Sequence, residues 1–149
     1  MAELGLVYPE HEKKHKMLHN NSHKFESSFV GLTIPQNDSV MFGSLSGNKL
    51  GIWIAHGEGK FSFPYKEKEY NIIAKYEYDS YPANPNGSQY GVAGVCSKDG
   101  RHLAMMPHLE RSIFPWQWAY YPSDRIKTDE ITPWLEAFVN AKKWIEKNK

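Results

Sequence analysis

The apolar run from Leu50 to Ala55 constrains the fold more than any other stretch of this sequence. The run is continuously apolar and contains Ile and Trp, a pattern typical of a strand that is buried on both faces. It ends abruptly at His56-Gly57-Glu58-Gly59. Because α/β folds place polar functional groups at the ends of buried strands, this pattern favours an α/β fold with a candidate site where the strand ends.

Three other parts of the sequence favour strands. They are a run from Phe25 to Ile34, a run rich in Ile and Tyr from Asn71 to Tyr78, and a pair of short runs from Gly91 to Cys96 and from Arg101 to Met106. The pair is joined by Ser97-Lys98-Asp99-Gly100, in which Asp-Gly is a strong turn signal. We therefore expect a β-hairpin whose second strand leads to His108.

Two stretches favour loops, and the C-terminal stretch favours a helix. Residues 10–24 are polar and rich in His and Lys, and residues 81–88 are rich in Pro, Asn and Gly, so neither suits regular structure. Near the C-terminus, Thr132 is a candidate N-cap and Pro133 suits the first helical position. An apolar stripe at helical spacing predicts that this helix packs on a core through Trp134, Ala137, Phe138, Ala141 and Ile145.

The composition excludes several classes of protein. The 149 residues suit one domain, and 18 Lys and Arg against 17 Asp and Glu leave a net charge of +1, which argues against a broad nucleic-acid-binding surface. No apolar run approaches the roughly 20 residues that cross a bilayer, and no export signal is visible. A single cysteine, Cys96, excludes an internal disulfide and a multi-cysteine metal site, which fits a soluble protein of the reducing cytoplasm.

His108 and Glu110 are the clearest candidates for chemistry. Two residues apart in extended chain, their side chains project to the same side and can form a hydrogen bond. A carboxylate that holds a histidine is the base-and-orienter half of a nucleophilic triad, although the same pair also occurs as a surface salt bridge. Cys96 is the candidate nucleophile, but the expected hairpin places it more than about 20 Å from His108. A small buried hydrophobic residue is therefore the favoured interpretation of Cys96.

Two other groups of polar residues allow two interpretations each. Histidines recur every four residues at His11, His15, His19 and His23. On a helix this spacing would align them as metal ligands, which would suit a metal-dependent hydrolase. The turn-prone residues 20–22 and the neighbouring lysines instead favour a solvated basic loop without a metal. His56 and Glu58 flank Gly57, which either allows close backbone approach to a ligand or forms a simple tight turn.

Four motifs, in order along the chain, resemble those of a known family. They are Asn20-Asn21-Ser22-His23-Lys24-Phe25-Glu26, Ala55-His56-Gly57-Glu58-Gly59-Lys60, Tyr81-Pro82-Ala83-Asn84-Pro85-Asn86-Gly87-Ser88 and Met105-Met106-Pro107-His108-Leu109-Glu110-Arg111. Together they resemble the glutamine amidotransferase domain of the phosphoribosylformylglycinamidine synthase family. The segment from Pro133 to Ala141 also resembles the end of the long single-chain form of that family, so the resemblance extends over nearly the whole chain.

The resemblance implies a class I glutamine amidotransferase of purine biosynthesis, with an α/β, flavodoxin-like three-layer fold and a mixed sheet. In that family a Cys-His-Glu triad hydrolyses glutamine, and the ammonia reaches a separate synthetase site that uses ATP and Mg to amidinate formylglycinamide ribonucleotide. His108 then corresponds to the general base and Glu110 to its orienting carboxylate. The residues expected to lie near bound glutamine are His56, Gly57, Glu58, Asn84, Asn86 and Gly87.

Two departures from the family pattern affect the expected function. Leu109 stands where the family usually has Pro, which leaves the His-x-Glu spacing intact. The family's nucleophile lies in a Cys-Asn-Gly-Cys-Gln elbow just before a helix that resembles Met1 to Leu6, and this sequence contains no such elbow. We therefore expect residues 1–149 to form a partial amidotransferase domain, truncated on its N-terminal side, that lacks the elbow and the strands before it.

These expectations define the partners and one alternative function. The missing nucleophile implies that the isolated chain is inactive. The missing strands imply an uncovered sheet edge, which promotes self-association or leaves the chain marginally stable. The expected partners are glutamine and the synthetase portion of the same enzyme, without nucleic acid or a membrane. No cofactor or metal is expected in this chain, because ATP and Mg belong to the synthetase portion. The alternative is a non-catalytic binding or interaction module.

Overall fold

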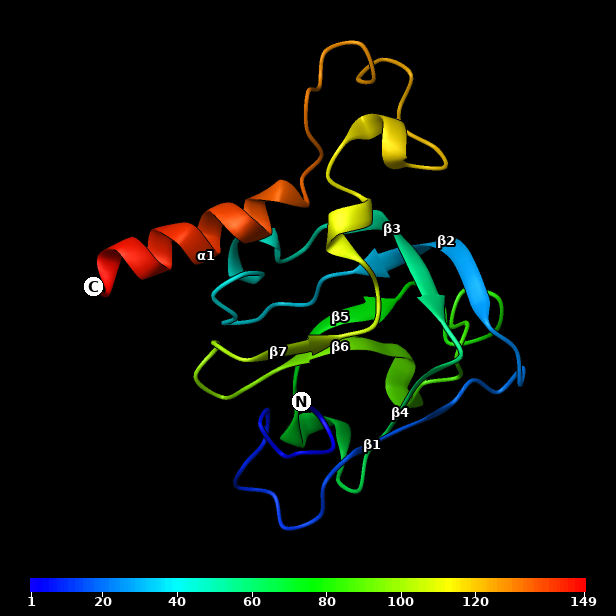
Figure 1. Cartoon of the computed structure of the whole chain (residues 1–149), viewed down its shortest axis with the longest axis vertical. Helices are drawn as coiled ribbons and strands as arrows, with labels where there is room; N and C mark the ends of the chain where they lie inside the picture. Colours follow the sequence, from blue (N-terminus) through cyan, green and yellow to red (C-terminus); the bar gives the residue numbers. More distant parts are fainter.

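Two antiparallel sheets and a C-terminal helix make up the computed structural model, which describes all of residues 1–149 (Figure 1). The larger sheet has the order β3-β2-β5-β6-β7, with bounds β2 Glu26–Thr33, β3 Lys49–His56, β5 Asn71–Tyr76, β6 Val92–Cys96 and β7 Leu103–Met105. The smaller sheet pairs β1 (Lys16–His19) with β4 (Glu58–Ser62), and α1 spans Leu135–Lys147. Short 3₁₀ turns lie at Gly43–Leu45, Glu67–Glu69, Gln89–Gly91, Leu109–Arg111 and Pro115–Gln117.

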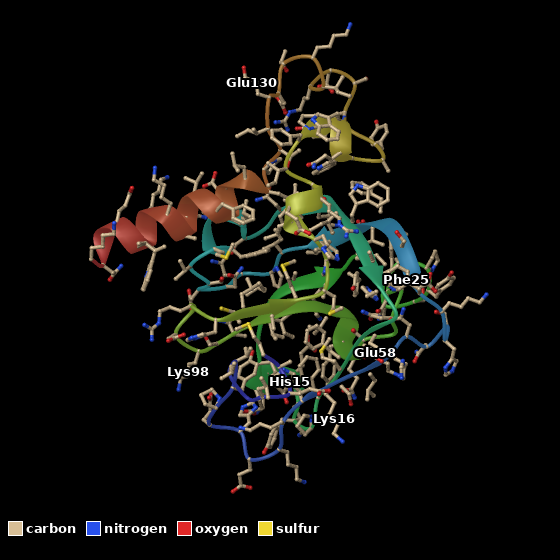
Figure 2. All side chains as sticks on the ribbon, viewed as in Figure 1. His15, Lys16, Phe25, Glu58, Lys98 and Glu130 are labelled. Atoms are coloured by element: carbon tan, nitrogen blue, oxygen red, sulfur yellow. The ribbon has the colours of Figure 1, made fainter.

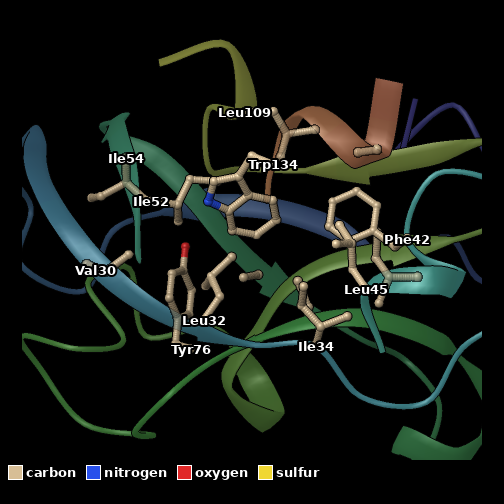
Figure 3. Close-up of a cluster of buried hydrophobic side chains, with 14 of the residues drawn as sticks. Val30, Leu32, Ile34, Phe42, Leu45, Ile52, Ile54, Tyr76, Leu109 and Trp134 are labelled. Atoms are coloured by element: carbon tan, nitrogen blue, oxygen red, sulfur yellow. The ribbon is translucent and has the colours of Figure 1, made fainter. Parts of the chain in front are cut away.

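The long hairpin formed by β2 and β3 supports the main core. Its strands pair in register over their full length. Residues that alternate along the inward face join the core beside the start of α1 (Figure 3), and these are Val30, Leu32, Ile52 and Ile54. On the outward face Phe29 packs on Trp53 and Trp118, and Trp53 is only half-buried. The prediction that this strand is buried on both faces is therefore correct for one face only.

Strand β6 is the one that is buried on both faces. All five of its residues are buried. Ala93 and Cys96 belong to the main core, whereas Val92 and Val95 belong to a second, aromatic cluster on the other side of the sheet. The aromatic cluster is completed by residues from the N-terminal segment, from β4 and from the segment after β4, namely Val7, Tyr8, Phe61, Phe63 and Tyr70. The sheet thus separates two cores, and β6 lies between them.

The loop predicted over residues 10–24 is interrupted by a strand. Residues Lys16–His19 form β1, in which Met17 lies opposite Phe61 and packs on the aromatic cluster. His15, just before β1, is buried against the rings of that cluster (Figure 2). A strand of four residues with one inward apolar side chain has too little alternation to be recognised in the sequence. Its pairing with β4 and the packing of Met17 stabilise it instead.

The predicted hairpin is confirmed, and it defines one edge of the larger sheet. Strands β6 and β7 pair antiparallel, with Cys96 opposite Leu103. Every strand pair in the two sheets is antiparallel, whereas the family resemblance implies a mixed sheet. The outer edge of β7 has no strand partner. The structure contains no helix long and apolar enough to cross a membrane.

The predicted C-terminal helix is present, but only its first part packs on the core. In the turn that precedes it, Thr132 Oγ1 accepts the backbone N–H of Trp134 at 3.3 Å. Trp134 is fully buried, and its indole Nε1 donates to the carbonyl of Gly51 at 2.8 Å. Phe138 and Ile145 are 40% and 52% exposed. The predicted apolar stripe therefore contacts the core only near the start of α1.

Replacing Trp134 by alanine removes a buried aromatic side chain and the donor to Gly51. We expect Trp134→Ala to lower the free energy of unfolding by about 3–5 kcal/mol, the usual cost of emptying a large core site. The matched control is Trp144→Ala on the exposed part of α1, expected to change stability by less than about 0.5 kcal/mol. Urea unfolding followed by circular dichroism measures both variants. Equal losses would contradict the packing of Trp134 described above.

Burial of His15 makes the stability of the fold depend on pH. The residue is 2% exposed, and its Nε2 has no hydrogen-bond partner. Burial is the main cause that holds the pKa of His15 below the ordinary 6.5, and the charge of the nearby His11 is the second. The folded state therefore favours the neutral ring, whereas the unfolded chain binds a proton near pH 6.5. The contribution of His15 to stability is complete above about pH 6.5 and is lost as the pH falls toward the lower folded-state pKa.

We expect His15→Phe, which keeps an aromatic ring in the cluster, to reduce the loss of stability on acidification. The control is His23→Asn, because His23 is exposed and has a positive φ that Asn tolerates. Thermal unfolding measured over a series of pH values tests both variants. If His15→Phe keeps the wild-type pH dependence, another group is responsible for it.

Candidate active site

Backbone hydrogen bonds place His108 on the free edge of β3. The N–H of Met106 donates to the carbonyl of Ala93, which continues the β6–β7 pairing for one more residue. Two residues later, the N–H of His108 donates to the carbonyl of Trp53 at 2.9 Å, forming an isolated bridge with β3. Leu109 then enters the main core. His108 is thus anchored on both sides, by β3 and by a buried side chain.

His108 and Glu110 form the predicted hydrogen bond. The distance between His108 Nδ1 and Glu110 Oε1 is 2.7 Å, and the side chains are 30% and 62% exposed. The sequence predicts an extended chain between these two residues, and that prediction is wrong. Glu110 lies in the 3₁₀ turn Leu109–Arg111. The turn folds the carboxylate back onto the ring, so the pair forms through a different backbone path from the predicted one.

The electrostatics of the pair favour an ionised carboxylate. Partial burial acts to raise the pKa of Glu110, but the hydrogen bond from His108 and the positive charge of Arg111 outweigh it, and the pKa lies below its usual value. A carboxylate can only accept, so Nδ1 of His108 carries the proton. The other ring nitrogen, Nε2, is then the basic atom available to a reactant.

The three residues of the His56-Gly57-Glu58 motif point to different places. His56 ends β3 and is buried, whereas Glu58 begins β4, is exposed, and pairs with His19 at 3.3 Å (Figure 2). A Cβ added to Gly57 would meet only the ring of Phe25, at an ordinary 3.8 Å. Packing within the protein therefore does not require glycine at position 57, and the backbone there is open to close approach.

The loop that contains Asn84, Asn86 and Gly87 is held by its own asparagines. Asn84 Oδ1 accepts the backbone N–H groups of Gly87 and Ser88, and Asn86 Nδ2 donates to the carbonyl of Gly59 at 2.7 Å. Both asparagines are buried, and Gly87 has a φ of 74°, a conformation that glycine adopts without strain. The loop is thereby attached to β4 directly after the His56 turn. Asn84 and Gly87 also line a cavity of about 460 Å³ that includes neither His108 nor Glu110.

Cys96 is not near His108. The thiol lies in the main core at the turn end of the hairpin, and burial raises its pKa. Cys96 lies opposite Leu103 at the turn end of β6, whereas the chain leaves the hairpin towards His108 at the other end, where Met106 bonds to Ala93. A buried thiol with a raised pKa is a poor nucleophile. The interpretation of Cys96 as a small buried hydrophobic residue is therefore the one that the structure supports.

The four histidines at four-residue spacing are not gathered at one point. His11 stacks on Tyr8, and His15 makes tilted contacts with rings of the aromatic cluster. His19 lies on β1, and His23 is exposed in the turn before β2. No group of three or more His, Cys, Asp or Glu side chains is arranged to hold a metal ion. The spacing therefore does not produce a helical row of ligands.

Asn20 is the site residue that the sequence analysis did not assign. It is 1% exposed, and its side chain bonds to the backbone and to the ring of His56. A single asparagine in a polar, turn-prone stretch gives no signal of which distant ring it contacts. Only the fold brings residues 20 and 56 together.

Comparison with known proteins identifies the family. A family model described as a CobB/CobQ-like glutamine amidotransferase domain matches residues 1–145. The chain belongs to this amidotransferase family. A phosphoribosylformylglycinamidine synthase of Drosophila melanogaster is 42% identical over 146 residues, which are 89% of this chain and 11% of that protein. A chloroplastic/mitochondrial protein of Arabidopsis thaliana, described as a probable phosphoribosylformylglycinamidine synthase, is 40% identical over 144 residues, 88% of this chain and 10% of that protein.

A solved structure supports the fold of this amidotransferase chain. The structure of PurLQS from Thermotoga maritima superposes with a TM-score of 0.66 and 26% identity, covering 89% of this chain and 54% of that chain. The expectation of an α/β, class I glutamine amidotransferase-like fold is thereby confirmed. The chain spans only about a tenth of the length of the two curated relatives.

Proposed function

We propose that this chain is part of the glutaminase domain of a phosphoribosylformylglycinamidine synthase, in which glutamine hydrolysis supplies ammonia to a synthetase portion of the same enzyme. The observation that carries this proposal is the 2.7 Å hydrogen bond between His108 and Glu110, in a chain that belongs to the amidotransferase family. The two curated relatives, at 40% identity or more, are named for that synthase activity. The sequence motifs and the geometry thus support the same reaction.

The pair performs the base chemistry of such a reaction as follows. Glu110 holds the Nδ1 proton of His108, which leaves Nε2 to accept the proton of a thiol nucleophile. The thiolate attacks the side-chain amide carbon of glutamine, and the imidazolium gives its proton to the amide nitrogen, which leaves as ammonia. Water, deprotonated by Nε2, then attacks the resulting thioester, and the thiol recovers the proton as glutamate is released. Glu110 stabilises the imidazolium formed at each stage and keeps the ring in one orientation.

The nucleophile in this proposal is a cysteine that is not among these 149 residues. Cys96 is excluded because it is buried in the main core at the turn end of the hairpin, opposite Leu103. We assign the turn of His56, Gly57 and Glu58 to the glutamine site, because the backbone at Gly57 is open. The loop of Asn84, Asn86 and Gly87 supports that turn through the bond from Asn86 to Gly59. ATP and Mg act only in the synthetase portion, and the reducing cytoplasm is the proposed compartment.

Glutamine added to the purified chain tests this function. We expect no glutamate release, no labelling by a glutamine-mimicking diazo-ketone, and changes in the NMR signals of the His108 and His56 rings on adding glutamine. The control ring is His102, which lies near the hairpin turn. Glutamate release that disappears in Cys96→Ala would show that the chain is a complete glutaminase. The absence of any ring response to glutamine would favour a non-catalytic binding module.

Self-association through the open edge of β7 is a second, separate proposal. The outer edge of this strand has no partner, and unpaired strand edges recruit other strands. The bonds from Met106 to Ala93 and from Ser97 to His102 show which backbone groups face β6, so the N–H groups of Leu103 and Met105 face outward. Sedimentation velocity over a range of concentrations should reveal a dimer that Met105→Pro weakens. A chain that sediments as a monomer at all concentrations would refute this proposal.

A further inference from the structure

The side-chain amide of Asn20 is fixed in one orientation. Its Nδ2 donates to the backbone carbonyl of Lys24 at 2.9 Å and to that of His56 at 2.7 Å. Both hydrogens of the amide are therefore committed to carbonyl oxygens, which cannot donate in return. A flipped amide would direct its oxygen at two carbonyl oxygens and lose both bonds. Because the residue is 1% exposed, water does not compensate for such a loss.

This orientation determines which nitrogen of His56 carries the proton. Asn20 Oδ1 lies 3.2 Å from His56 Nδ1, and an amide oxygen can only accept. The proton of a neutral ring must therefore be on Nδ1, and Nε2 has only a lone pair. His56 Nε2 is buried and has no hydrogen-bond partner in the protein. The site thus contains a buried acceptor that no donor of the protein satisfies.

The charges around His56 keep the ring neutral. Burial is the largest cause that lowers its pKa, and His108 acts in the same direction, whereas a backbone hydrogen bond of His56 and the charge of Glu26 on β2 act against them. From the turn before β2, Lys24 contributes only a backbone carbonyl to this network. From β4, Glu58 pairs with the exposed His19. No carboxylate is hydrogen-bonded to the ring itself.

We propose that Asn20 is a positioning residue of the amidotransferase site, which fixes His56 as the neutral Nδ1–H tautomer. His56 then serves as a hydrogen-bond acceptor and never as a second cation beside His108. The neutrality of His56 matters because Glu110 supplies one negative charge, which is enough to stabilise one imidazolium, that of His108. The functional part of this inference rests on the proposed glutaminase role, whereas the tautomer does not.

Long-range ¹H–¹⁵N NMR of the histidine rings in the 149-residue chain tests the proposal. In the wild type we expect His56 to show a protonated Nδ1 and a bare Nε2 at neutral pH. In Asn20→Asp, one carboxylate oxygen faces Nδ1 and should raise the proton affinity of the ring by about ten- to a thousandfold, as opposite charges at this distance do. The other oxygen replaces the amide donor, so the variant also loses the bonds to the carbonyls of Lys24 and His56. Both nitrogens of His56 would then be protonated near neutral pH.

The matched control is Asn21→Asp, the same substitution one residue away. Asn21 is exposed and its amide oxygen accepts from Lys60, so this variant should leave the His56 signals unchanged. A wild-type ring with the proton on Nε2, or with both nitrogens protonated at neutral pH, overturns the proposal even if Asn20→Asp does not fold. Equal responses of His56 in the two variants also overturn it.

Glutamine added to the same samples separates the two ideas. A bare Nε2 on His56 that shifts when glutamine is added supports both the tautomer and the proposed function. The expected tautomer without any response of His56 or His108 to glutamine supports the fixed ring but contradicts the glutaminase role. A wrong tautomer together with a glutamine response overturns only the role of Asn20.

Discussion

The free edge of β3 is the constraint on which the site depends. An edge strand presents unpaired backbone groups, and here the C-terminal third of the chain satisfies three of them. The carbonyl of Trp53 accepts from His108, the N–H of Trp53 donates to Ser112 Oγ, and the carbonyl of Gly51 accepts from the indole of Trp134. The segment that carries the candidate base is therefore held in place by the same bonds that cover the edge.

This arrangement couples the core to the chemistry. Trp134 and Leu109 both enter the main core, and His108 lies between the edge of β3 and Leu109. The residues between them cross above β3 and return to it at the start of α1 (Figure 1). Trp134 and His108 are therefore attached to the same strand two residues apart, at the carbonyls of Gly51 and Trp53.

Local patterns in the sequence identified most of the larger sheet but not its burial. The strands β2, β3 and β5 and the β6–β7 hairpin follow from alternation, apolar runs and the Asp-Gly turn. The apolar sequence of β3 predicts a strand that is buried on both faces, because Trp53 is an apolar residue. In the structure the ring of Trp53 lies on the outer face of the sheet, against Phe29. β1 was missed because its pairing with β4 is a long-range contact that four residues do not encode. Tertiary packing decided each of these cases.

The candidate site shows the same division between local and distant information. The pair of His108 and Glu110 could be predicted because the two residues are neighbours in sequence, although the turn that joins them was not. The bond between Asn20 and His56 spans 36 positions and could not be predicted from either residue. Spacing reveals a chemical pair only when the chain between its members is short.

The exposure of the pair limits the electrostatic support that Glu110 gives to His108. Glu110 is largely exposed, and an exposed ion pair stabilises a charge by only about 0–1 kcal/mol, because water and salt screen it. Covering the pair removes that screening and strengthens the hold of Glu110 on an imidazolium. In the proposed glutaminase, we expect the part of the enzyme that brings the thiol to His108 to provide this cover as well. The nucleophile and the low-dielectric environment that the base requires would then arrive together.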